Sequence, residues 1–127
     1  MLPNDLNEWL SDTDSIIVDR RAAGAVLSPI EQLIYEIWLL DTQKRNGGLS
    51  QYFCNCGLEQ WRQCIVAAND VGLSSFMRFA TQVNALIAGS KDPYKVLIKR
   101  GHVGDDIYDE HSSRIVRELR EKYSPVA

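Results

Sequence analysis

Residues 28–57 constrain the fold of this chain more than any other segment. They begin with Ser-Pro-Ile-Glu, in which a serine N-cap precedes a proline at the first helical position and a glutamate three residues after the cap. Apolar residues then recur at spacings of three and four, as on one face of an α-helix. The pattern stops at Asn-Gly-Gly (46–48), where asparagine and glycine tolerate the left-handed backbone of a helix C-terminus. The segment predicts a strongly apolar helix at the centre of the domain.

The remaining segments repeat this order of cap, apolar stripe and glycine stop. No run alternates with the period of two that is typical of a half-buried strand. With Ser28 and Ser74 as N-caps and Pro125 as the last stop, helices are predicted over residues 6–17, 28–46, 49–55, 58–70, 74–88, 92–99 and 105–123, with a connector at 20–27. We therefore predict an all-α protein, a single compact domain (residues 1–127) of about six or seven helices around a central apolar helix.

The composition limits the class of protein. With 127 residues, 45% of them apolar and 24% charged, the chain has the size and composition of one soluble globular domain. No apolar run approaches the ~20 residues that span a bilayer. The first residues show neither a basic leader nor an apolar core, so no signal peptide is expected. We expect a cytoplasmic protein that does not interact with membranes.

Acidic residues cluster near the two ends of the chain. The net charge of −3 and the pI near 5.3 argue against direct nucleic-acid binding. Residues 1–19 contain five acids, Asp19 included, and no Lys or Arg. Lys91, Lys95 and Lys99 are expected to form a solvated face. The acids that could contact a partner are Asp5, Glu8, Asp12, Asp14, Asp105, Asp106, Asp109 and Glu110.

Three cysteines, Cys54, Cys56 and Cys64, lie close together in the sequence. Their odd number, in a chain for which no secretion signal is expected, favours reduced thiols. They and the distant histidines do not offer four ligands at zinc spacing, and residues 105–111 match no calcium loop. We therefore predict no metal and no cofactor, and we interpret the cysteines as small packing residues. A cysteine nucleophile would need a histidine brought close by the fold.

The amide- and aromatic-rich segment after the glycine turn is the sharpest candidate for a site. Gln51 and Asn55 are four residues apart, so their amides share one helix face. They could bind a ligand or a peptide backbone, or they could connect the glycine turn to the core helix by hydrogen bonds. The structural alternative is favoured, because Gly-Gly alone explains the turn. The motif residues are Asn46, Gly47, Gly48, Gln51, Tyr52, Phe53, Asn55 and Gly57.

The same residues resemble the signature of a known family. In order they are Glu31, Tyr35, Trp-Leu-Leu (38–40), Asn-Gly-Gly, an apolar residue, Gln51, two aromatics, Asn55 and a glycine. This order is similar to that of a bacterial family typified by a DNA-mimic protein and otherwise of unknown function. Here Leu49 replaces an aromatic residue of the signature, and one spacer residue before Gly57 is missing.

The resemblance implies an all-α fold and a homodimer. It also implies that one family member presents surface carboxylates in place of DNA and occupies the DNA site of a transcription factor. Such mimicry requires a dense, ordered field of negative charge. This chain carries a net charge of only −3 and interleaves cations with its acids.

Three functions remain open from the sequence. The first is a non-enzymatic helical module that occupies or inhibits a partner protein, for example a DNA-binding protein or a toxin, by DNA mimicry or as an immunity-type inhibitor. The second is a small enzyme or ligand-binding protein that uses the amides of Asn46, Gln51 and Asn55. The third is a structural or assembly protein. We expect the first, because the sequence contains no recognisable reaction centre.

Overall fold

The computed structural model describes residues 2–123, and every regular element in that range is a helix. The helices are α1 (Asn4–Ala22), α2 (Pro29–Gly47), α3 (Leu49–Asn55), α4 (Gly57–Asp70), α5 (Ser74–Ile87), α6 (Pro93–Lys99) and α7 (Val103–Lys122). The prediction of an all-α protein with six or seven helices is confirmed. Within residues 2–123, no helix combines the length and the apolar character needed to cross a bilayer.

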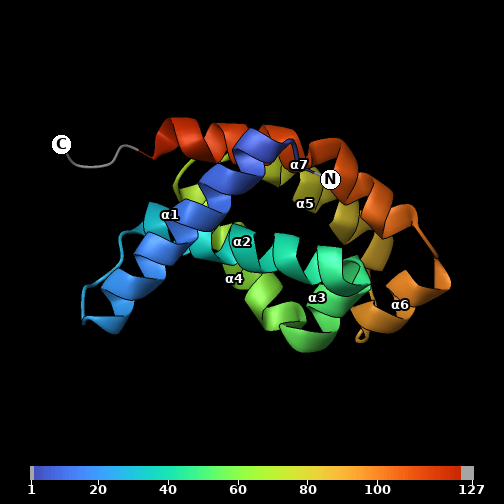
Figure 1. Cartoon of the computed structure of the whole chain (residues 1–127). Coiled ribbons are helices and arrows are strands. Elements are labelled where there is room, and N and C mark those ends of the chain that lie inside the picture. The colour runs from blue at the N-terminus through green and yellow to red at the C-terminus, as the bar shows by residue number, and fades with distance from the viewer. Residues whose placement is uncertain (1, 124–127) are drawn as a thin grey trace.

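α2 is the central helix, with α1, α3, α4 and α7 packed against it (Figure 1). Its start has the predicted capping box: the Glu31 N–H donates to Ser28 Oγ at 3.3 Å, and the Ser28 N–H donates to Glu31 Oε1 at 3.0 Å. The apolar residues that α2 buries are Leu33, Ile34, Ile37 and Leu40. The central position follows from this continuous apolar face, because a helix at the periphery would leave part of it in contact with water.

The aromatic pair of the motif belongs to the core. Tyr52 and Phe53 are buried beside Trp61, with ring centroids 6.2 and 5.3 Å from the indole. Phe76 and Phe79 of α5 approach the same indole at 5.8 and 5.7 Å. α3, α4 and α5 are therefore joined by one aromatic cluster, in which edge-to-face geometry adds to the burial of apolar area.

Two helices begin earlier than the sequence predicted. α1 starts at residue 4 rather than 6, and it continues to Ala22 because Arg20 and Arg21 suit the negative end of the helix dipole. The predicted connector 20–27 is therefore wrong in its first residues. α7 starts at Val103 rather than Asp105, so the predicted starting residue lies inside the first helical turn. Pro125, the predicted stop, lies outside the described residues.

The cap of α5 comes from another helix, and the prediction of Ser74 as its N-cap is wrong. Ser74 is the first helical residue, and Glu118 of α7 supplies the acceptors. The Ser75 N–H and hydroxyl donate to Glu118 Oε1 at 3.0 and 2.8 Å, and the Ser74 hydroxyl donates to Oε2 at 3.0 Å. Burial alone would raise the pKa of Glu118, but these bonds hold it below its usual value.

Candidate functional site

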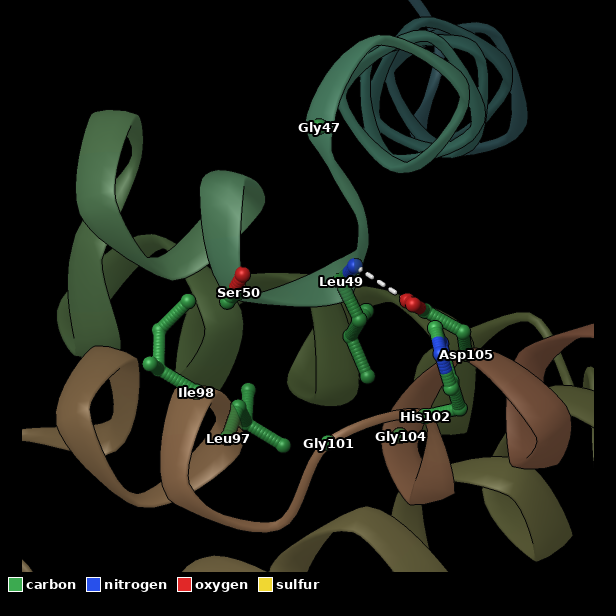
Figure 2. A pocket seen from close by; sticks show the side chains of 9 residues that line it. All are labelled: Gly47, Leu49, Ser50, Leu97, Ile98, Gly101, His102, Gly104 and Asp105. Atoms are coloured by element: carbon green, nitrogen blue, oxygen red, sulfur yellow. Dashed lines mark hydrogen bonds between the residues drawn. The ribbon is translucent and has the colours of Figure 1, made fainter.

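The glycine turn places α3 against the start of α7. Gly48 has φ +84° and ψ 170°, a backbone conformation that is essentially restricted to glycine. The Leu49 N–H, at the start of α3, donates to Asp105 Oδ1 at 2.7 Å (Figure 2). A Cβ on Gly48 would lie 3.1 Å from the same oxygen. The turn thus needs glycine for its backbone angle and for the close carboxylate.

The two motif amides share one acceptor on the core helix. Gln51 Nε2 and Asn55 Nδ2 both donate to Gln43 Oε1 of α2, at 3.0 and 2.8 Å. Gly47 belongs to the same arrangement, because a Cβ there would overlap the Gln51 side chain. Asn46 lies exposed in the last turn of α2. The geometry is that of a tie between α3 and α2, and Asn55 is exposed rather than buried in it.

A groove runs beside this tie, between α3 and α6. It consists of two adjoining depressions of about 240 and 390 Å³, which share Gly47, Ser50 and Ile98. The smaller one reaches the start of α7 and includes Asp105 (Figure 2). The larger one is lined by motif amides on the α3 side and by Tyr94 and Ile98 of α6. The sequence motif therefore forms one wall of a surface concavity.

A family model described as DMP19-like protein matches residues 25–126. The chain belongs to this family. No curated protein and no solved structure matches the chain. The matched region includes the glycine turn, both motif amides and the whole of α7, whereas α1 precedes it.

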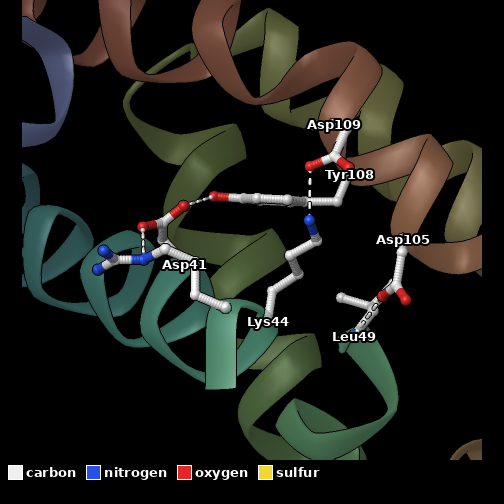
Figure 3. Close-up of polar contacts among 7 residues, drawn as sticks. Asp41, Lys44, Leu49, Asp105, Tyr108 and Asp109 are labelled. Atoms are coloured by element: carbon white, nitrogen blue, oxygen red, sulfur yellow. Dashed lines mark hydrogen bonds and ion pairs between the residues drawn. The ribbon is translucent and has the colours of Figure 1, made fainter. Parts of the chain in front are cut away.

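In this DMP19-like protein, a polar network joins α2 to the acidic part of α7 (Figure 3). The buried Tyr108 hydroxyl donates to Asp41 Oδ1 at 2.6 Å, and Arg45 Nε lies 3.0 Å from Asp41 Oδ2. Burial and the Asp41 charge raise the pKa of Tyr108 well above its usual value, so this hydroxyl remains a donor. Lys44 Nζ donates to Asp109 Oδ1 at 2.6 Å, which helps to lower the pKa of Asp109 against the effect of burial.

The four acids predicted on α7 therefore separate into two kinds. Asp105 caps α3 and Asp109 pairs with Lys44. Asp106 and Glu110 are exposed. The exposed side chains farther along the outer face of α7 are mixed in sign: Arg114, Arg117, Arg120 and Glu121. The structure does not bring these acids into a continuous strip along α7.

The acids of α1 are arranged differently. Asp5, Glu8, Asp12 and Asp19 are exposed and fall within about 60° around the helix axis, since each residue advances by about 100°. Asp5 lies 3.7 Å from Arg120 of α7 in an exposed ion pair. Asp14 is on the opposite side and only 4% exposed, so it is not available to a partner. The α1 stripe is defined here as Asp5, Glu8, Asp12 and Asp19.

The three thiols differ in their exposure. Cys54 is exposed, Cys56 is half-buried and Cys64 is buried. Burial and the Glu36 charge raise the pKa of Cys56 and Cys64, which opposes thiolate formation. His111 is buried with its ring 6.2 Å from that of Phe79. Among residues 2–123, no three His, Cys, Asp or Glu side chains are grouped so that they could hold a metal ion.

Sequence reasoning missed the partners that organise the site. Gln43 and Glu118 were not singled out, although each holds a residue that was, and neither Asp41 nor its partner Tyr108 was singled out. Their separations from those partners along the chain are 8 to 67 residues. Gln43 could have been found by its position on the last turns of a helix that ends in Gly-Gly, because the chain must fold back there. Nothing local marks Asp41 or Glu118.

Proposed function

We propose that this protein works without catalysis, by binding a partner protein through the α1 stripe. The observation that carries the proposal is the alignment of four exposed carboxylates on one helix face, of which Asp5 alone pairs with a cation, Arg120 of α7, among the described residues. Aligned charge of one sign steers a partner of the opposite sign and fixes its register. The partner would present a basic patch, as DNA-binding proteins and many toxins do.

The charge density favours an immunity-type inhibitor over a mimic of duplex DNA. Over the ~21 Å from Asp5 to Asp19, the α1 stripe offers about one charge per 5 Å. Duplex DNA carries about one charge per 1.7 Å. The rest of the surface does not make up the difference, because 13 of the 14 Lys and Arg residues are exposed, against 11 of the 17 Asp and Glu residues. Mimicry of DNA would therefore need a dimer that places two stripes side by side.

The test is a comparison of two charge variants that lose the same number of exposed acids. One is D5N/E8Q/D12N on α1, and the other is D106N/E110Q/E121Q on α7. Each variant and the parent protein is used as bait in a host lysate, and captured proteins are quantified by mass spectrometry at low and high salt. We expect a basic partner that is lost with the α1 variant and with salt, and retained by the α7 variant.

Two outcomes would count against the proposal. A partner captured equally by both variants, at both salt concentrations, would indicate an apolar interface elsewhere. A partner lost only with the α7 variant would move the contact to Asp106 and Glu110. In either case the α1 stripe would be a solvated helix face.

The alternative function is a ligand-binding protein or small enzyme at Asn46, Gln51 and Asn55. The observation that favours it is the depression of about 390 Å³ that Gln51 and Asn55 line. Against it, each of these two amides already donates one N–H to Gln43. Their amide oxygens remain as polar groups for an occupant of the groove.

A further inference from the structure

The larger half of the groove between α3 and α6 has the features of a peptide-binding surface. Its volume of about 390 Å³ is large enough to take one or two side chains of a peptide. On the α6 side it is lined by Tyr94 and Ile98, which are one helical turn apart and 39% and 56% exposed. Large apolar side chains left exposed at the edge of a concavity commonly mark an interaction site.

The α3 side offers polar groups that suit a peptide backbone. Gln51 and Asn55 each donate one amide N–H to Gln43, and their amide oxygens accept no hydrogen bond within the described residues. The Ser50 hydroxyl is also without a hydrogen-bond partner in residues 2–123, and it lines the same depression. Backbone N–H groups of an incoming segment could therefore be satisfied at this wall.

The charged residues around the groove are mainly basic, which favours a negatively charged occupant. Lys95 and Lys99 directly follow Tyr94 and Ile98 in α6, so they occupy the adjacent helix face and are exposed. Lys91 and Arg100 are exposed at the two ends of the helix. The lining of the larger depression contains no charged side chain.

The acids near this groove do not cancel the cations. Asp92 caps α6, accepting the Lys95 N–H at 3.2 Å, and lies 3.9 Å from Lys95 Nζ. Asp105 lines the smaller depression, where it accepts the Leu49 N–H. None of the ion pairs among the described residues involves Lys91, Lys99 or Arg100. The rim along α6 is therefore left with uncompensated positive charge.

We propose that the groove between α3 and α6 binds a short acidic peptide segment of a partner protein, with an apolar side chain between α3 and Tyr94/Ile98 and carboxylates against Lys95 and Lys99. This surface is distinct from the α1 stripe and opposite to it in charge. The proposal therefore does not depend on the function proposed for α1.

The experiment uses the full chain, labelled with nitrogen-15, and a set of acetylated hexapeptides. Each peptide carries glutamate at the outer positions and Leu, Ile, Phe, Tyr or Trp at the central two. Matched sets carry lysine outside or serine inside. We expect the acidic apolar peptides alone to perturb amide resonances of residues 50–55 and 94–99 at millimolar concentration.

Two pairs of variants separate the contributions. Ile98→Ser should weaken the tightest peptide about fivefold, by loss of half-exposed apolar contact, whereas Val26→Ser, at an exposed site on the connector before α2, should not. K95E/K99E should weaken it about tenfold at low salt, and R114E/R117E on α7 should not. The unbound spectrum of each variant shows whether its fold is retained.

Three results would overturn the proposal. One is the absence of perturbation by every acidic peptide. Another is equal binding of the lysine or serine sets. The third is peptide binding that perturbs resonances of α1 or α7 instead. The same conclusion would follow if the groove resonances shifted with protein concentration alone, because the acidic α1 of a second copy would then occupy the groove.

Discussion

Asp14 is the acidic side chain that α1 turns toward the interior. It is 4% exposed, and its Oδ1 has no hydrogen-bond partner in the described part of the chain. Burial raises the pKa of this carboxyl from 3.8 to about 6. The folded state therefore holds the proton more tightly than the unfolded state. Above pH ~6 the buried charge costs about 3 kcal/mol, and below pH ~4 the carboxyl is protonated in both states and the cost vanishes.

Asp14→Asn should consequently stabilise the protein in a pH-dependent way. The free energy of unfolding should rise by up to about 3 kcal/mol near pH 7.5 and by little near pH 3.5. Urea denaturation at the two pH values measures this. Asp12→Asn, at an exposed neighbouring position, is the control and should show no such gain. A gain of equal size at both pH values would mean that removing the charge is not its cause.

Gly48 is required both for its backbone angle and for the close approach of Asp105. Comparison with the same substitution at a second glycine, Gly24, separates the two effects. Gly48→Ala should cost about 1–3 kcal/mol of backbone strain, and displacement of Asp105 should add about 1 kcal/mol through the lost Leu49 hydrogen bond. Gly24 has φ +91°, and a Cβ added there would have no neighbour within 4 Å, so Gly24→Ala reports strain alone. Thermal unfolding and hydrogen exchange of the Leu49 amide are the measurements. If both variants lose the same free energy of unfolding and the Leu49 amide stays protected from exchange, contact with Asp105 does not contribute to the cost of Gly48→Ala.

At the scale of elements, the two side-chain hydrogen bonds that run from α3 to α2 end on one amide oxygen, Gln43 Oε1. Gln43→Ala removes the acceptor of Gln51 and Asn55 together and should cost about 1–2 kcal/mol. Asn55→Ala should cost less, because Asn55 is exposed. In the Gln43→Ala background it should cost almost nothing, since the shared partner is already gone. Denaturant unfolding of the four proteins in this cycle, with exposed Gln63→Ala as a control, tests the coupling.

The opposite outcome for Asn55 is equally informative. If Asn55→Ala unfolds like the parent protein but abolishes binding of a partner or ligand, the amide serves recognition rather than the tie between helices. The alternative function at Asn46, Gln51 and Asn55 would then be the better one.

For the whole molecule, α4 offers a self-complementary face for the expected homodimer. Val66 is 60% exposed, with Arg62 four residues before it and Asp70 four residues after it, both exposed. In an antiparallel pair of α4 helices centred on Val66, each Arg62 would face Asp70 of the other copy. We expect a dimer by light scattering at tens of micromolar protein.

Charge substitutions on α4 give this dimer prediction a sharp test. Arg62→Asp should yield monomers, because it places two acids opposite each other on each side of the axis. The exchange R62D/D70R should restore the dimer. A parent protein that is monomeric, or a dimer that ignores both variants, would contradict the α4 interface.

The helices were predictable from sequence because their signals are local. The capping box of Ser28 and Glu31 and the Gly-Gly stop lie within a few residues of the boundaries that they set. The cap of α5 was not predictable from sequence, because Glu118 lies 43 residues from Ser75. The same holds for the site: the pairing of Gln51 and Asn55 followed from helical spacing, whereas the groove depends on where α6 returns to α3, which no local pattern encodes.

The position of α1 changes what can be treated as an autonomous piece of this protein. The family match begins at residue 25, yet α1 packs on α2 and α7, and its Leu6, Leu10 and Ile17 are at most 1% exposed. Each such side chain contributes roughly 1.5–3 kcal/mol, and together they rival the net stability of roughly 5–15 kcal/mol of a whole domain. A protein trimmed to the shared region would expose the apolar surface beneath α1 to water. The region that the family model matches is therefore smaller than the packed core of this protein, to which α1 contributes.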